Sequence, residues 1–217
     1  MSGSKRRISR ITKALLLFCM LCANSVLAAE TWLTESSRYL EQLLKSNPHR
    51  LPELEQDAVL ESYRSRHFKP LWSNEQGRLD RAYDLLHVII RARDEGLDPA
   101  DYHLEQLKKY WDSPGLGESV KLDLLLSAAL YRYSNDVYSG RFVASEVDPD
   151  WHIKNENLDT GKLFTDVARQ SSISRLLKKL PPRHDGYLAL KEQLKQFREL
   201  AQQGGWPRFG WGPVLER

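Results

Sequence analysis

The feature that most constrains the fold is a long segment near the middle of the chain, residues 118–140, with the sequence ESVKLDLLLSAALYRYSNDVYSG. Its apolar side chains cover most of the circumference of a helix: Val120, Leu122, Leu124, Leu125, Leu126, Ala128, Ala129, Tyr131 and Tyr133. A helix that is apolar nearly all round must be surrounded by other elements. We therefore expect a central, buried helix that ends at Gly140.

The segments on both sides also show helical periodicity. Helices are predicted over residues 32–44, 52–68, 79–96, 98–111, 163–168, 173–180 and 187–203. The last of these carries apolar residues at steps of three and four: Tyr187, Leu190, Leu194, Phe197 and Ala201. The stretch FKPLWSNEQG breaks the pattern, and RFVASEVDPDWHIKNENLD reads as a long irregular loop. No segment shows a convincing strand alternation, so we expect an all-α fold, a single bundle-like domain of several helices.

The N-terminus has the order of a secretory signal peptide. SKRRISRITK is basic, ALLLFCMLCANSVLA is apolar, and Val26 and Ala28 are small residues at a cleavage position. We predict a signal peptide over residues 1–28. The alternative is a membrane anchor, but a spanning helix needs about 20 apolar residues, and this run is shorter. Lipid attachment at Cys19 or Cys22 is disfavoured, because bulky residues precede both.

Loss of residues 1–28 changes what the composition permits. The chain has 32 Lys and Arg against 29 Asp and Glu. The signal carries five of the basic residues, so 27 remain, and the slight negative balance argues against nucleic-acid binding. Both cysteines also lie in the signal. The mature chain therefore has no cysteine nucleophile, no disulfide and no cysteine metal site, and its membrane contact ends with cleavage.

The histidines show no paired metal-binding spacing. Asp84 and His87 lie one helical turn apart and are candidates to share a ligand, but we favour a hydrogen bond on the helix surface. His103 is expected to be partly packed, and His152 and His184 to be solvated. The pairs Lys178-Lys179 and Lys191/Lys195 are interpreted as solvated faces.

The loop SEVDPDWH places Glu146, Asp148 and Asp150 beside Trp151. Carboxylates next to an aromatic ring suit a sugar cleft, whereas Asp-Pro-Asp is also ordinary turn chemistry, which we favour. Five tryptophans are candidates either to stack on glycan or to pin loops to the core: Trp72, Trp111, Trp151, Trp206 and Trp211. No residue is assigned a catalytic, cofactor-binding or metal-binding role, and no cofactor is expected.

Several segments together resemble a known family. They are YRSRHFKPLW, RARDEGLDPADYH, KLDLLLSAALYRYSNDVYSGR, VDPDWHI and LLKKLPPRHDGYLALKEQLKQFRELAQQGGWP, in this order. From about Leu51 to Pro207 the chain resembles the N-terminal scaffold domain of the large periplasmic L,D-transpeptidases of Gram-negative bacteria. The resemblance implies a helical scaffold without catalytic residues, located in the periplasm and concerned with peptidoglycan in cell wall biogenesis.

In this family a peptidoglycan-binding domain and a catalytic domain follow the GGWP turn. The catalytic domain has a cysteine nucleophile in a Ser-His-Gly-Cys-type motif, which this sequence lacks. We therefore expect a non-enzyme: a scaffold domain over residues 29–207 and, over 208–217, a truncated linker toward an absent domain. A truncated gene product and a stand-alone scaffold with a separately encoded catalytic partner both remain open.

Two other functions stay open at this point. One is a periplasmic adaptor that binds peptidoglycan or a cell-wall protein. The other is a glycan hydrolase that uses Glu146, Asp148 or Asp150.

Overall fold

The computed structural model describes residues 27–46, 51–113, 115–142, 146, 148, 150 and 156–206. Most of these residues are helical, and the strands among them are two short ones, so the predicted all-α fold is confirmed. The predicted linker over 208–217 lies outside the described residues, as does the predicted signal peptide except for its last two residues.

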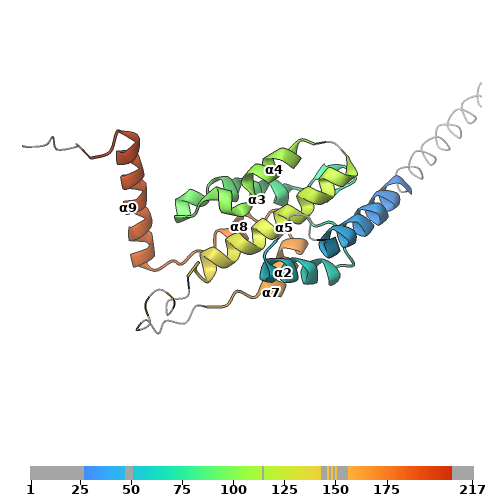
Figure 1. Cartoon of the computed structure of the whole chain (residues 1–217), viewed down its shortest axis with the longest axis horizontal. Coiled ribbons are helices and arrows are strands. Elements are labelled where there is room, and N and C mark those ends of the chain that lie inside the picture. Colours follow the sequence, from blue (N-terminus) through green and yellow to red (C-terminus); the bar gives the residue numbers. More distant parts are fainter. Residues whose placement is uncertain are drawn as a thin grey trace, which may run out of the picture.

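The central helix is α5, Leu116–Tyr138, which runs through the middle of the molecule (Figure 1). Thirteen of its residues are buried, among them Leu124, Leu125 and Leu126. The helix ends at Tyr138, two residues before the predicted end at Gly140, and Gly140 has a left-handed φ of 86°. The apolar pattern therefore predicted both the position and the burial of this helix.

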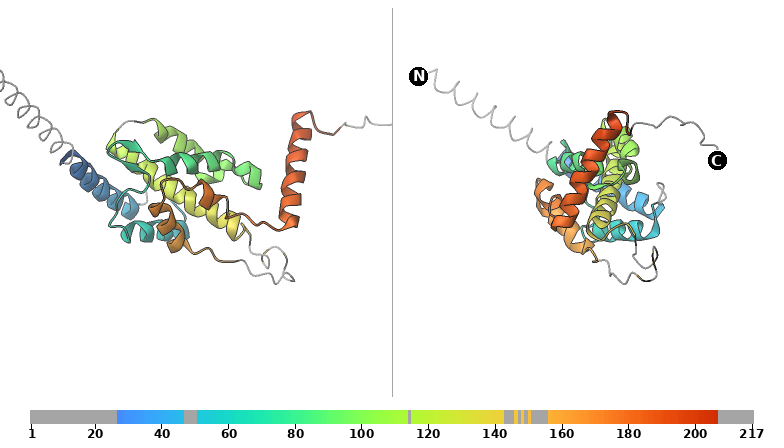
Figure 2. Two further views of the ribbon diagram at one scale, coloured as in Figure 1. Left: turned by 180° about the vertical axis from the view of Figure 1, so that it is seen from behind. Right: turned by 90° about the vertical axis from the view of Figure 1, so that its left-hand side faces the viewer.

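Other helices cover α5 from several sides (Figures 1 and 2). The described helical residues 27–46 and α2, Glu53–Arg64, lie on one side, and α2 also contacts α7, Thr160–Arg169. Helices α3, Asp80–Ile90, and α4, Leu104–Trp111, lie on another, with α8, Ser174–Leu177, packed on α3. One core results, formed by buried side chains from all of these helices.

The predicted 79–96 helix is in fact two elements. α3 ends at Ile90, and the 3₁₀ helix η1, Ala92–Glu95, follows it. Gly96 ends η1 with a φ of 81°, as the sequence indicated. The next segment begins as predicted, because the Asp98 side chain accepts a hydrogen bond from the Ala100 amide at the start of η2, Pro99–Tyr102.

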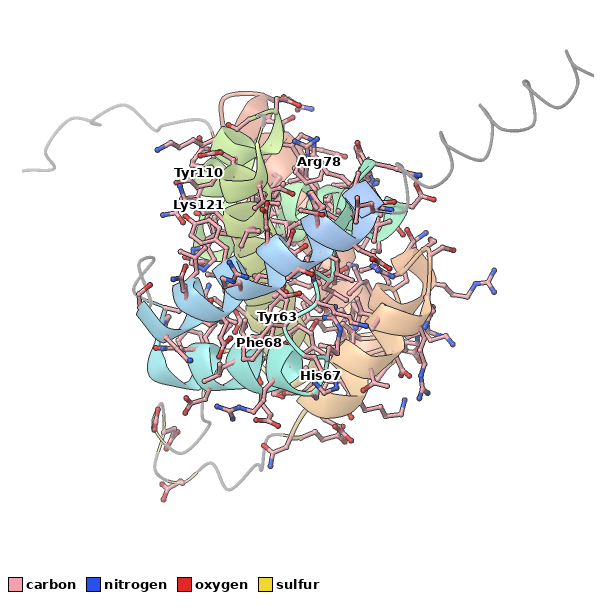
Figure 3. The ribbon with its side chains drawn as sticks, turned by 90° about the vertical axis from the view of Figure 1, so that its right-hand side faces the viewer. Tyr63, His67, Phe68, Arg78, Tyr110 and Lys121 are labelled. Carbon is pink, nitrogen blue, oxygen red and sulfur yellow. The ribbon has the colours of Figure 1, made fainter. Side chains whose placement is uncertain are left out.

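The irregular stretch after α2 contains a small hairpin. Strands β1, Ser73–Asn74, and β2, Gly77–Arg78, pair antiparallel. Just before them α2 ends in a tight left-handed turn, visible around the labelled Tyr63, His67 and Phe68 in Figure 3. The Phe68 amide donates to the Tyr63 carbonyl at 2.8 Å, which fixes this turn.

A buried carboxylate holds the hairpin segment against α5. Asp123 accepts hydrogen bonds from the amides of Leu71 and Trp72, both at 2.8 Å, and from the Tyr63 hydroxyl. Burial raises the pKa of Asp123, although these hydrogen bonds oppose the shift. Since every one of these donors comes from the fold itself, we interpret Asp123 as a structural group.

Helix α9, Asp185–Gln202, stands apart from the other helices at one end of the molecule (Figures 1 and 2). It has no buried residue, and its main contacts are with η1. Its apolar spacing is that of a core-facing helix, yet Leu190 is 70% exposed and Phe197 is 56% exposed. Among the described residues, no helix is long and apolar enough to cross a membrane.

Candidate functional site

A cleft of about 760 Å³ lies where α9 meets the rest of the molecule. Its walls come from α3, η1, α5, the segment around α8, and α9. The apolar part of the lining is Val88, Tyr133, Leu177, Pro181, Pro182, Tyr187 and Leu188. This volume is typical of sites that bind small molecules or short peptides.

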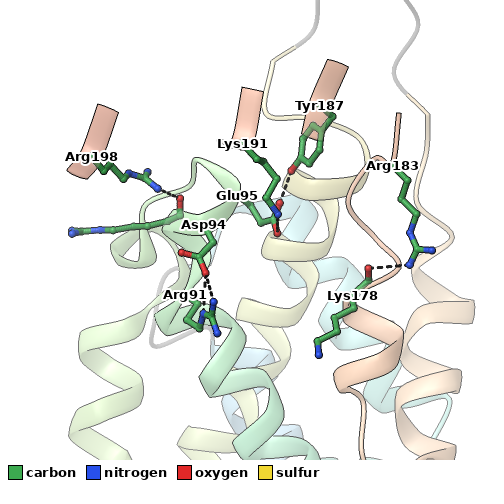
Figure 4. Close-up of polar contacts among 9 residues, drawn as sticks. Arg91, Asp94, Glu95, Lys178, Arg183, Tyr187, Lys191 and Arg198 are labelled. Atoms are coloured by element: carbon green, nitrogen blue, oxygen red, sulfur yellow. Dashed lines mark hydrogen bonds and ion pairs between the residues drawn. The ribbon is translucent and has the colours of Figure 1, made fainter. Parts of the chain in front are cut away.

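One carboxylate, that of Glu95 in η1, connects the cleft to α9. Glu95 accepts a hydrogen bond from the Tyr187 hydroxyl at 2.6 Å and pairs with the Lys191 ammonium at 2.7 Å (Figure 4). Burial, together with the hydrogen bond to Glu95, raises the pKa of Tyr187 well above its ordinary value. The phenol is protonated at neutral pH even without this shift, so Tyr187 is the donor in its hydrogen bond with Glu95.

Two further contacts order the same region (Figure 4). Arg91 pairs with Asp94 at 2.8 Å, across one turn at the junction of α3 and η1. The Arg198 guanidinium donates to the Arg93 carbonyl, near the C-terminal end of α9. Both acidic groups of the lining, Asp94 and Glu95, thus already have cationic partners.

Two cations of the lining have no such partner. Lys178 and Arg183 both line the cleft and both are exposed. Arg183 donates to the Lys178 carbonyl at 3.3 Å (Figure 4). Among the residues that the structure describes, no carboxylate forms an ion pair with either side chain. The cleft therefore presents uncompensated positive charge beside an apolar wall.

A second cavity of about 680 Å³ continues the cleft along α9. The two share Arg91, Asp94, Leu188 and Lys191 in their linings. The second one adds charges of both signs: Glu192, Lys195, Arg198 and Glu199. Together they form a groove between α9 and the rest of the molecule, which we call the α9 groove.

Asp84 and His87 have separate surroundings. Asp84 accepts hydrogen bonds from the hydroxyls of Ser172 and Ser174, both at 2.7 Å, and from the Ile173 amide at 2.7 Å. Burial favours a higher pKa for Asp84, but these hydrogen bonds outweigh it and hold the pKa below its ordinary value. Asp84 thus ties the start of α8 to α3, while His87 lines the cleft.

The loop carboxylates are described only in part. Glu146 and Asp150 are exposed, and Asp148 accepts from the Asp150 amide at 3.0 Å, the geometry of a turn. Their neighbour Trp151 and the histidine after it lie outside the described residues. The described part of this loop therefore agrees with the turn interpretation.

His103 and His184 have partners within the fold. His103, with its side chain 17% exposed, contacts the Glu55 carboxylate at 3.1 Å, as expected for a partly packed residue. His184 is exposed, and its ring accepts from the Tyr187 amide at the start of α9. Within the described ranges no group of three or more His, Cys, Asp or Glu residues is arranged to hold a metal ion.

The five candidate tryptophans divide into three groups. Trp72 is 1% exposed and donates to Ser127, so it belongs to the core. Trp111 meets Tyr83 edge to face and has the labelled Arg78 over its ring at 5.1 Å (Figure 3). Trp206 is 71% exposed, whereas Trp151 and Trp211 lie outside the described residues.

The sequence did not reveal the cleft. Lys191 was expected on a solvated face, which is wrong, because it reaches back to Glu95 and is 32% exposed. Lys178 is exposed as expected, but its position at a cleft was not anticipated. The sequence contained little indication of the cleft, because its lining residues are spread from position 87 to position 191 and share no motif.

A family model described as "Scaffold domain" matches residues 57–194 of this chain. The match extends from within α2 to within α9, and it includes every residue that lines the cleft. No curated protein and no solved structure gives a significant match.

Proposed function

Because the chain belongs to the Scaffold domain family, we propose that it acts as a non-catalytic, exported scaffold of the machinery that cross-links peptidoglycan. The match over residues 57–194, which is most of the described molecule, carries this proposal. The ordered segments that resemble the scaffold domain of L,D-transpeptidases supply the link to the cell wall. The basic and apolar N-terminus supports export to the periplasm.

Two properties of the chain support a non-catalytic role. An L,D-transpeptidase holds its acyl donor as a thioester, which requires an activated thiolate, and no cysteine follows residue 22. Asp123, the most deeply buried carboxylate among the described residues, accepts hydrogen bonds from donors of its own fold. We propose that the scaffold contributes surfaces that bind and position either a separate catalytic partner or peptidoglycan.

An adaptor that binds peptidoglycan or a cell-wall protein is the second candidate. One observation favours it, the open α9 groove with uncompensated positive charge at Lys178 and Arg183. The two candidates are compatible, since an adaptor is also a scaffold that acts through binding.

The experiment uses protein recovered from the periplasmic fraction, whose intact mass should correspond to a chain that begins at Ala29. This protein is incubated with tetrapeptide-bearing muropeptides and, separately, with a carbapenem, which acylates the cysteine of the related enzymes. We expect no cross-linked dimers, no exchange of the terminal D-amino acid and no acyl adduct.

An active L,D-transpeptidase assayed in parallel serves as the positive control. Dimers or a stable adduct formed by the purified protein would contradict the proposal, and the adduct's position would identify a nucleophile. Full-length protein that retains residues 1–28 would contradict cleavage of the signal.

A further inference from the structure

We propose that the cleft at the N-terminal half of α9 binds a short peptide through a free carboxylate, with Lys178 and Arg183 as its anion-binding groups. The inference deepens the proposed function and rests on it for the choice of peptide, the stem of peptidoglycan. The geometry of the cleft itself does not depend on that choice.

The first step is the charge balance of the lining. Glu95 is occupied by Tyr187 and Lys191, and Asp94 by Arg91. These pairs leave Lys178 and Arg183 as the Lys and Arg residues of the cleft lining that form no ion pair with a described carboxylate. A guanidinium binds a carboxylate in a bidentate way, and an ammonium adds a second charge.

The second step is the position of Arg183. It follows directly on Pro181 and Pro182, which also line the cleft. Proline has a fixed φ, so the chain that carries Arg183 loses little freedom when a ligand binds. Its guanidinium is already oriented by the Lys178 carbonyl at 3.3 Å.

The third step is the apolar wall. Leu188 is 51% exposed, Pro181 and Pro182 are partly exposed, and all three line the cleft. They offer an apolar surface beside the cations. A ligand that combines a negative group with an apolar part, as a peptide with a terminal carboxylate does, is complementary to this arrangement.

The acidic residues of the α9 groove make it a poorer fit for a polyanion than for a ligand with one or two negative charges. Asp94, Glu95, Glu192 and Glu199 lie along the same groove as the cations. A nucleic acid or polyphosphate would bring several phosphates against these carboxylates, and such repulsion is costly. Within the cleft itself, Lys178 and Arg183 are the unpaired lysine and arginine of the lining, and one or two negative charges on the ligand fit them.

The test is isothermal titration calorimetry, which measures the dissociation constant of the mature protein for the free tetrapeptide stem of peptidoglycan. We compare wild type with the double variant Lys178→Glu/Arg183→Glu. The matched control is Arg175→Glu/Lys179→Glu, which makes the same change of charge at neighbouring exposed residues outside the cleft lining. Circular dichroism of both variants checks that they fold.

We expect the tetrapeptide to bind wild type and the control variant within about twofold of each other, while the cleft variant binds about tenfold more weakly or worse, because two attractive charges become repulsive. A tetrapeptide with amidated carboxylates should lose binding to the same extent. Equal binding by wild type and the cleft variant, or no binding by wild type, would overturn the inference.

A final arm separates this inference from the proposed function. The peptide Ala-Glu-Lys-Ala made of L-amino acids also ends in a free carboxylate, but it lacks the stereochemistry of a cell-wall stem. If it binds through Lys178 and Arg183 as tightly as the stem does, the cleft is confirmed as a carboxylate site, but the link to peptidoglycan loses its support. If neither peptide binds, the inference is wrong, while the absence of acyl transfer still tests the proposed function.

Discussion

At the scale of single residues, Asp84 connects segments that lie far apart in the sequence. Its carboxylate accepts hydrogen bonds from Ser172, Ile173 and Ser174, almost ninety positions later in the chain. The contact fixes the start of α8, and α8 leads into the chain that carries Lys178 and Arg183 toward the cleft.

Replacement of Asp84 by asparagine should lower the free energy of unfolding by about 1 kcal/mol near neutral pH, as for the loss of a capping carboxylate. The folded-state pKa of Asp84 lies below its ordinary value. Its stabilisation is therefore fully present above the unfolded pKa of about 3.9 and is lost as the pH falls through the folded pKa. The difference in the free energy of unfolding between wild type and Asp84→Asn should therefore become smaller as the pH falls.

Urea unfolding of both proteins across this pH range measures the gap. Asp112→Asn, at an exposed position after α4, is the control and should leave stability almost unchanged. A gap that stays constant down to the most acidic condition would mean that the charge of Asp84 does not hold α8.

Residue contacts of this kind were beyond the reach of the sequence. The spacing of Asp84 and His87 correctly placed both on one helix, but it gave no information about residues 172–174. The sequence is more informative where the partner is close: the predicted helix start at residue 98 coincides with Asp98, whose side chain accepts from an amide two residues away.

At the scale of elements, α9 was predicted from its apolar spacing, yet its environment was not. The helix forms over Asp185–Gln202, but Leu190 and Phe197 face solvent instead of a core. Periodicity reports that a face is apolar, and it does not report what covers that face. Tyr187 and Lys191 provide the attachment through Glu95, a polar contact that no apolar pattern predicts.

From this attachment we predict how fast the backbone amides of α9 exchange with solvent. With few apolar contacts, α9 should exchange its backbone amide hydrogens faster than α5. The double variant Tyr187→Phe/Lys191→Met removes both contacts with Glu95 and should accelerate exchange in α9 further, while the exchange of α5 stays the same. Hydrogen–deuterium exchange followed by mass spectrometry resolves the two helices.

Gln193→Ala, at an exposed position of α9, serves as the control and should leave the exchange of both helices unchanged. If the double variant exchanged like wild type throughout α9, other contacts would have to hold the helix in place.

The hairpin β1–β2 is a second element that could not be predicted from the sequence. Strands of two residues have no alternation to detect, so the sequence indicated only a break after α2. The segment is ordered by Asp123, a charged residue within the apolar helix α5 that the sequence analysis did not single out. A buried carboxylate in such a pattern is a usable signal for a long-range polar contact.

At the scale of the whole molecule, the stability of the fold should depend on α5 far more than on α9. Leu125 is 0% exposed in the middle of the core, while Leu190 is 70% exposed on α9. The same substitution at both positions separates burial from residue type. Leu125→Asp places an unpaired charge in the core and should cost several kcal/mol, out of a typical stability of about 5–15 kcal/mol.

Leu190→Asp should change the free energy of unfolding by less than about 1 kcal/mol, since the side chain stays in solvent and only helix propensity is affected. Circular dichroism should show an unfolded or strongly destabilised Leu125→Asp protein and a native spectrum for Leu190→Asp. Equal stability of the two variants would mean that α5 is not the centre of the fold. A Leu190→Asp variant as unstable as Leu125→Asp would instead mean that α9 packs its apolar face within the domain.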